Sequence, residues 1–248
     1  MRKVGILLCL VCRLWSVAAA QDSFHIRVHE YEPVPGALVF EEHTIYVGAG
    51  TKSPDGLVAP TNNQLHIAHE FTAGLTPAFS LGAMLLNARR INGGLEYAGW
   101  KILPHLYAPT TLGLPANIGI VAEFTVQPKT YADGAGEIEI HPILEKHFKG
   151  LAFVANPSFG RTLNPSGNRQ GWTFHPALRS AYDVSKRLTL GVEYYGQSAR
   201  FLSAHSTIDV KFTDNMVWSL GVNVGHDSND NHVIYTSRLQ ISLGQRKR

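Results

Sequence analysis

The chain has 248 residues, of which 22 are Lys or Arg and 19 are Asp or Glu, giving a formal net charge of +3. Both cysteines, Cys9 and Cys12, lie in an N-terminal segment that is expected to be removed, which excludes a disulfide, a thiolate nucleophile and a cysteine-based zinc site from the mature chain. Three basic residues leave with that segment, and the remaining 19 basic and 19 acidic side chains provide no positive excess for binding nucleic acid.

The first 20 residues have the order of a secretory signal peptide. Arg2 and Lys3 precede an apolar run, and Ala18–Ala20 supply the small residues before an expected cleavage after Ala20. The apolar run is too short for a spanning helix and is followed by Arg13. We therefore expect an exported chain with a signal peptide at 1–20, a lead segment at 21–37 and one β-barrel domain at 38–248.

From residue 38 onward, apolar and polar residues alternate with a period of two, as in strands with one apolar face. In Leu65–Thr72, for example, Leu65, Ile67 and Phe71 share one face. The pattern predicts about twelve strands, and the even number and the lengths near 10 residues are typical of bacterial outer-membrane barrels. The expected ranges are 38–49, 64–73, 78–88, 95–106, 117–127, 136–147, 150–161, 172–184, 187–198, 206–213, 216–225 and 231–243.

The predicted connections alternate between short and long. Short ones fall at 75–77, 148–149, 185–186 and 214–215, and longer polar ones at 51–63, 89–94, 128–135, 162–171, 199–206 and 226–231. This alternation is typical of a membrane barrel with tight periplasmic turns and longer external loops. The connection at 107–116 is long where a short one is expected, which indicates either a periplasmic excursion or a different strand count.

A secreted soluble β-barrel or sandwich is the alternative fold. A soluble domain carries many charges on its outer face, whereas the polar face here is rich in Gly, Ala, Ser and Thr and has only single charges. Aromatic residues near segment ends, such as Trp100 and Trp218, match the aromatic girdles of membrane barrels. We therefore predict an all-β fold, a single antiparallel transmembrane β-barrel whose lumen receives Glu70, Lys101, Glu123, Glu139, His141, Arg179, Glu193, Lys211 and Arg238.

These lumenal charges leave two interpretations open: a ladder of ion pairs that closes the barrel, or a polar constriction that selects solutes by charge. The twelve histidines do not predict a metal site. His66 and His69 point to opposite faces of a strand, and His25 and His29 are about 13 Å apart if extended, too far for one ion. We expect no metal and no cofactor.

An outer-membrane hydrolase is the enzymatic alternative. His226-Asp227-Ser228 offers a possible base and nucleophile in a predicted external loop. The Gly, Asp and Asn residues around it are ordinary turn residues, and the spacing alone identifies neither an oxyanion hole nor an orienting partner. We expect no catalytic residues.

Several short motifs resemble a family of small bacterial outer-membrane barrels, some of which are grouped as transporters of a phenol-degradation pathway. The resemblance covers about Leu65–Leu243 and implies an outer-membrane location and the passage of small, including aromatic or neutral, solutes. It brings no site residues, and the basic end Arg246–Arg248 departs from the terminal aromatic residue that is common in such barrels. The motifs are His69-Glu70-Phe71 before Gly74-Leu75-Thr76, the run Glu137–Glu145, the pair Asn156-Pro157 and the run Leu190–Gly196.

The sequence thus predicts an outer-membrane β-barrel that serves as a passive channel or transporter for small solutes and contacts outer-membrane lipids. A non-conducting structural or surface-interaction barrel remains the main alternative. Without the last three basic residues, residues 21–245 carry 16 basic and 19 acidic side chains. This small acidic excess favours cations or neutral solutes over anions.

Overall fold

The computed structural model describes residues 26–54, 56–90, 93–132, 136–163, 171–197, 201–226 and 231–244, without the side chains of 197, 201 and 202. The predicted signal peptide and the basic C-terminal end therefore lie outside the described residues. The strands are β1 (Leu38–Ala49), β2 (Leu65–Thr76), β3 (Phe79–Arg89), β4 (Leu95–Tyr107), β5 (Asn117–Val126), β6 (Gly136–Phe148), β7 (Leu151–Leu163), β8 (Thr173–Ser185), β9 (Leu188–Gln197), β10 (Phe201–Thr213), β11 (Met216–His226) and β12 (Asn231–Leu243).

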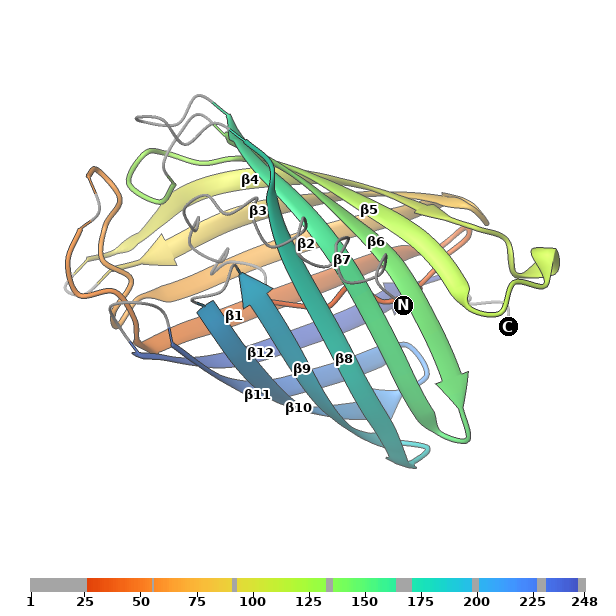
Figure 1. Cartoon of the computed structure of the whole chain (residues 1–248). Coiled ribbons are helices and arrows are strands. Elements are labelled where there is room, and N and C mark those ends of the chain that lie inside the picture. The colour runs from red at the N-terminus through yellow and green to blue at the C-terminus, as the bar shows by residue number, and fades with distance from the viewer. Residues whose placement is uncertain are drawn as a thin grey trace, which may run out of the picture.

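The twelve strands form one closed antiparallel barrel in which each strand pairs with its neighbours in sequence (Figure 1). Closure comes from β1 and β12, which pair in a register that sets Tyr46 opposite Tyr235. Pairing around the whole ring leaves no sheet edge, which a barrel in lipid requires because no water is present to bond free backbone groups. The predicted antiparallel barrel of twelve strands is confirmed.

One predicted strand boundary is wrong by five residues, whereas the others agree with the structure to within three. The sequence pattern predicted a loop at 199–206, but β10 begins at Phe201. Ser203 and His205 are buried on the inner side of this strand, and Ala204 between them is exposed. Because both the inner and the outer residues here are small or polar, the alternation of hydrophobicity that marks the other strands is absent.

The connections separate into two ends of the barrel. Four hairpins have tight turns, and the β6–β7 turn has φ of 47° at Lys149 and 81° at Gly150, the two positive values of a two-residue type I′ turn. The connection from β4 to β5 lies at this same end and contains a short 3₁₀ helix, η1 (Thr110–Leu112). It is therefore an excursion between two strands, and the strand count is unaffected. No helix among the described residues has the length and apolar character needed to span a membrane.

The outer surface of the barrel is apolar and the inner surface is polar. Large hydrophobic side chains, including Phe124, Leu190 and Ile208, are exposed on the outside, at 42%, 45% and 48% of their full area. Buried on the inside are charged residues such as Glu41 and Glu193. A soluble barrel has the opposite arrangement, and an apolar belt of this kind is the lipid-facing surface of a transmembrane barrel. The soluble alternative does not fit.

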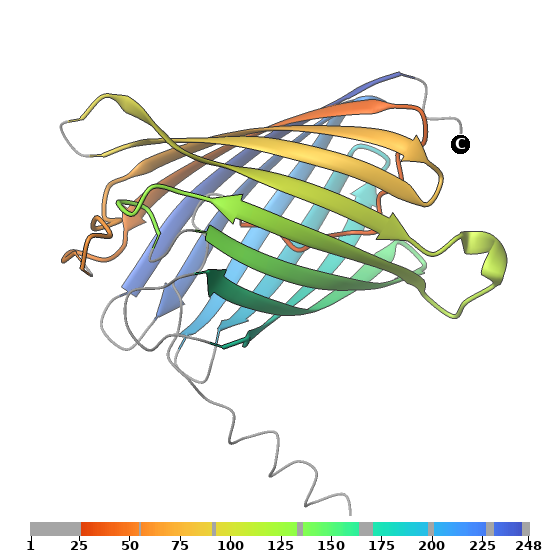
Figure 2. The ribbon, with the colours of Figure 1, turned by 90° about the horizontal axis from the view of Figure 1, so that it is seen from above.

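The chain before β1 folds back into the barrel. Gly36 adopts φ of +66° in a turn, its N–H donates to the Gly74 carbonyl at 2.9 Å, and Gly74 N–H donates to the Ala37 carbonyl at 2.9 Å. A side chain on Gly74 would meet the Val34 carbonyl oxygen at 1.6 Å, so only glycine on β2 permits this approach. Residues 26–34, here called the lumen segment, then run inside the ring of strands (Figure 2, red-orange trace).

The lumen segment alternates apolar and polar side chains. Ile26 and Val28 are buried against a small apolar cluster on the inner wall that includes Ile45, Val121 and Tyr195. The polar residues between and after them reach charged groups on the wall. Burial of the two apolar side chains stabilises the enclosed segment by about 1.5–3 kcal/mol each.

Candidate channel lumen

The predicted lumenal residues fall into separate groups on the inner wall. Glu70, Lys101, Glu123, Arg179 and Glu193 are buried, and Glu139, His141, Lys211 and Arg238 are partly buried. Lys211 pairs with Asp214 beside the β10–β11 turn at 2.8 Å, at the edge of the barrel. The other eight lie along the wall that faces the lumen segment, in three clusters.

The first cluster is centred on Arg179 of β8. Its Nη1 is 2.5 Å from Glu193 on the neighbouring strand β9, and its Nη2 is 2.7 Å from Asp209 on β10. Its Nε is 3.2 Å from Glu30 of the lumen segment. Gly191 makes room for the guanidinium, because a Cβ there would lie 3.1 Å from Nη1 of Arg179 and closer still to Thr207. One buried cation is thus matched by three carboxylates, as burial of charge requires.

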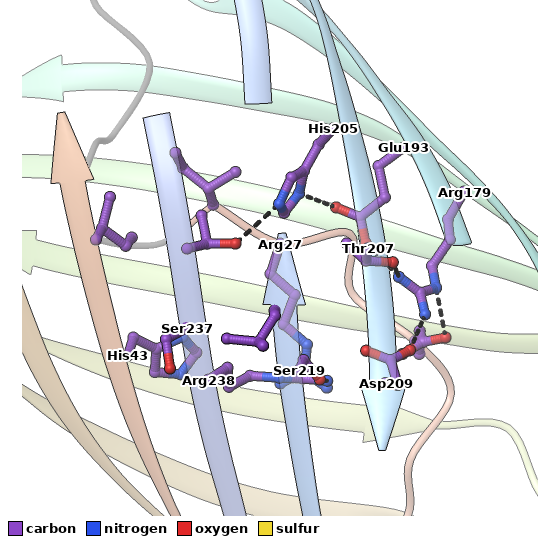
Figure 3. A pocket seen from close by; sticks show the side chains of 15 residues that line it. Arg27, His43, Arg179, Glu193, His205, Thr207, Asp209, Ser219, Ser237 and Arg238 are labelled. Carbon is purple, nitrogen blue, oxygen red and sulfur yellow. Dashed lines mark hydrogen bonds and ion pairs between the residues drawn. The ribbon is translucent and has the colours of Figure 1, made fainter. Parts of the chain in front are cut away.

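Glu193 extends this network around the wall. Its second oxygen accepts a hydrogen bond from the Tyr195 hydroxyl and lies 3.0 Å from Nδ1 of His205. Nε2 of His205 lies 2.9 Å from the hydroxyl of Thr236 on β12. Figure 3 shows the contact of His205 with Glu193, with Arg27 and Arg238 nearby. The pocket that Arg179, Glu193 and His205 help to line has a volume of about 30 Å³, room for about two water molecules.

The second cluster surrounds two carboxylates that are directly opposite each other. Glu41 on β1 pairs in register with Glu70 on β2, an arrangement of like charges that is destabilising by itself. Arg27 of the lumen segment donates to both oxygens of Glu41 at 3.0 and 3.2 Å, and Nε2 of His43 lies 3.2 Å from Glu41 and 3.8 Å from Glu70. Burial opposes the charge of Arg27, but Glu41 and Glu32 raise its pKa above the ordinary value, so it stays a cation.

The third cluster is on β4, β5 and β6, between the other two clusters in the order of the strands, and again contains facing carboxylates. Glu123 on β5 pairs in register with Glu139 on β6. Nζ of Lys101 is 2.6 Å from one oxygen of Glu123. Nε2 of His29, from the lumen segment, is 3.0 Å from the other oxygen, and Nε2 of His141 is 3.8 Å from it. The lumen segment therefore supplies a basic side chain to each pair of facing carboxylates.

The backbone of the lumen segment is held by side chains of the wall. The amide of Asn156 on β7 accepts from His29 N–H at 2.7 Å and donates to the His29 carbonyl at 3.0 Å, the two bonds that a neighbouring strand would make. Glu145 on β6 accepts from Tyr31 N–H at 2.8 Å. The Tyr31 hydroxyl donates to the Ala108 carbonyl at 2.6 Å, and because burial and Glu145 raise its pKa, the phenol keeps its proton.

Sequence reasoning missed the residues of this segment. Residues 21–37 were expected only to lead into the barrel, and the structure places Arg27, His29 and Glu30 among the lumenal charges. One signal was present: Pro35 and Gly36 form a turn just before the first strand, and the residues ahead of it alternate apolar and polar like a strand. Of the hydrolase motif, only His226 is described, with its Nδ1 2.9 Å from Asn231; Asp227 and Ser228 lie outside the described residues.

No protein-family model matches the sequence, and no curated relative matches it. Solved structures are similar in fold. The COG4313 outer membrane channel from Pseudomonas putida F1 aligns with a TM-score of 0.61 at 11% identity, covering 88% of this chain and 100% of that one. KdgM porin aligns with a TM-score of 0.52 at 11% identity, covering 83% of this chain and 99% of that one. The chain thus has the fold of bacterial outer-membrane channels.

Proposed function

We propose that this protein is an outer-membrane channel for small solutes and that the lumen segment forms its constriction. The observation that carries the proposal is the polar, charge-lined interior of a barrel whose outer face is apolar. A non-conducting structural barrel does not require buried ion pairs, because such pairs contribute little net stability. The similarity in fold to outer-membrane channels supports the same function. We assign it no catalytic residues.

The charges of the lumen favour neutral and cationic solutes. Each described cation of the three clusters is paired with carboxylates, and the carboxylates outnumber the cations on the wall. An anion entering this space meets facing carboxylates, at Glu41 with Glu70 and at Glu123 with Glu139. The expected solutes are therefore small and neutral, aromatic compounds included, or positively charged.

Recording from planar bilayers tests the proposal. Detergent-folded protein without an affinity tag is expected to produce discrete conductance steps. Under a salt gradient, the sign of the reversal potential is expected to show selectivity for cations. Anion selectivity would contradict the charge argument. Persistent silence from protein that still shows heat-modifiable gel migration would support the second candidate, a non-conducting barrel.

That second candidate is favoured by one observation. The described part of the lumen is packed around residues 26–34, with Val28, His29 and Glu123 all less than one-tenth exposed. Conduction therefore requires the segment to move or a path beside it to widen. A variant that loosens the segment separates the two functions: a channel becomes more conductive, and a structural barrel stays silent.

A further inference from the structure

The third lumen cluster brings together three ligand atoms of the type that bind transition metals. We infer that His29, Glu123 and His141 form a binding site for a divalent zinc-type ion that joins the lumen segment to the barrel wall. The ligand atoms of the three residues all lie within 4.8 Å of one another. The three side chains come from the lumen segment, β5 and β6, which bring together residues far apart in the sequence.

The distances match a shared ion. Ligand atoms bound to one tetrahedral zinc at 2.0–2.2 Å are separated by about 3.3–3.6 Å. Nε2 of His29 and Nε2 of His141 lie 3.0 and 3.8 Å from the same oxygen of Glu123, on either side of that value. Two histidines and one glutamate with a fourth position for water is a ligand set that zinc uses in proteins. Imidazole also suits copper and nickel ions.

The surroundings orient the ligands toward a cation. The Ser158 hydroxyl donates to the Asn156 carbonyl at 3.3 Å, so its oxygen is free to accept from Nδ1–H of His141, at 2.8 Å. In the tautomer that donates from Nδ1, neutral His141 carries its lone pair on Nε2, which lies 3.8 Å from Glu123 and 3.9 Å from Glu139. A lone pair and a carboxylate oxygen that face each other are stabilised by a cation between them. The backbone of His29 is held at the same time by Asn156.

The second cluster contains a comparable trio, Glu41, His43 and Glu70. There, however, two guanidinium groups already approach Glu41, Arg27 at 3.0 Å and Arg238 at 3.7 Å, and they repel an added divalent ion. At the third cluster one cation, Lys101, binds the oxygen of Glu123 that the histidines do not approach. The geometry and the charge balance therefore both favour the third cluster.

The inference rests on the proposed function in one respect: an ion at this place would fasten the constriction to the wall and close a channel. The site itself does not depend on conduction. Binding is therefore measured directly, by zinc titration of tag-free folded protein in detergent and by the visible spectrum of the cobalt(II)-loaded form. Amide hydrogen exchange of residues 28–31 with and without zinc reports whether the ion holds the segment.

We expect one tight zinc equivalent and slower exchange of the segment amides when zinc is present. Loss of a ligand in His29→Gln or His141→Gln is expected to weaken binding more than about 100-fold, and Ser158→Ala about 10–100-fold, as is usual for a residue that orients a ligand. The matched control is His43→Gln, which removes the rival trio and is expected to leave the tight equivalent intact.

Equal zinc affinity in wild type, His29→Gln and His141→Gln overturns the inference, as does loss of the tight equivalent in His43→Gln alone. Unchanged exchange of residues 28–31 on zinc binding refutes the bridge to the lumen segment. If tight binding and slowed exchange are found in a protein that does not conduct even after a chelator has removed the metal, the site stands and the channel function fails. The two outcomes are therefore distinguishable.

Discussion

The attachment of the lumen segment to Asn156 leads to a quantitative prediction for Asn156→Ala. The substitution removes three hydrogen bonds, of which one joins Asn156 to the Pro142 carbonyl on the wall at 3.1 Å. The other two, at 2.7 and 3.0 Å, hold the lumen segment, and their loss leaves the N–H and the carbonyl of His29 buried without these partners. An unsatisfied buried polar group costs about 1–3 kcal/mol, so the change favours release of the segment by about 2–6 kcal/mol. The lower value corresponds to about a 30-fold larger population of the released state.

Hydrogen exchange measures this population directly. In Asn156→Ala, the amides of Val28–Tyr31 are expected to exchange at least about 30-fold faster, whereas amides of β5 keep their protection because the wall remains paired. Asn223→Ala is the matched control. Asn223 is also fully buried in the lumen, but its side chain bonds to Ser203 at 3.2 Å on the wall, not to the segment.

The reasoning is refuted if Asn156→Ala leaves the exchange of the segment unchanged, or if Asn223→Ala accelerates it equally. In bilayers, the same pair of variants separates the two proposed functions. Conductance that rises in Asn156→Ala and stays at the wild-type level in Asn223→Ala identifies the segment as the constriction of a channel.

Three further predictions concern the wall and the outer surface. Arg179→Met leaves buried Glu193 and partly buried Glu30 and Asp209 without their shared cation. It is expected to destabilise the barrel by about 3–5 kcal/mol, seen as a lower urea midpoint of folding into detergent or lipid, and a midpoint equal to wild type would contradict the network. Gly74→Val collides with the Val34 carbonyl, so we expect the segment to leave the lumen, with rapid exchange of its amides but retained heat-modifiable migration. Ile208→Lys on the lipid-facing side is expected to cost about 2–4 kcal/mol and Phe212→Lys, near the turn, about 0–1 kcal/mol, so equal losses would argue against the assigned membrane depth.

The sequence was sufficient for the barrel because its strands carry the required information in neighbouring residues. In β5, for instance, outward Ile120 and Phe124 alternate with inward Val121 and Glu123, and the same period recurs around the ring. Strand β10 shows where this reasoning fails. Around Ser203–Ser206 both faces are small or polar, and the pairing with β9 and β11 alone, not hydrophobicity, makes the strand.

The site was harder to predict because it depends on contacts between residues far apart in the chain. A period of two indicates that Glu123 and His141 face inward, but neither strand pattern shows that His29 joins them. The comparison of His29 with its sequence neighbour His25 led to the expectation that no metal site exists. The fold instead sets His29 beside a histidine on β6, and only the path of the segment through the lumen reveals this.

The path of the segment has a consequence for assembly. The segment joins β1 through a tight turn. Its end next to β1 is therefore fixed beside the wall and cannot enter the barrel separately after the barrel has closed. Its partners, however, are on β1, β5, β6, β7 and β8, and the β1–β12 seam must form to complete the wall around it. Contacts between such distant parts of the chain form slowly because each requires closing a long loop. We therefore expect docking of the segment and closure of the β1–β12 seam to come late in assembly, after the strands between them have paired.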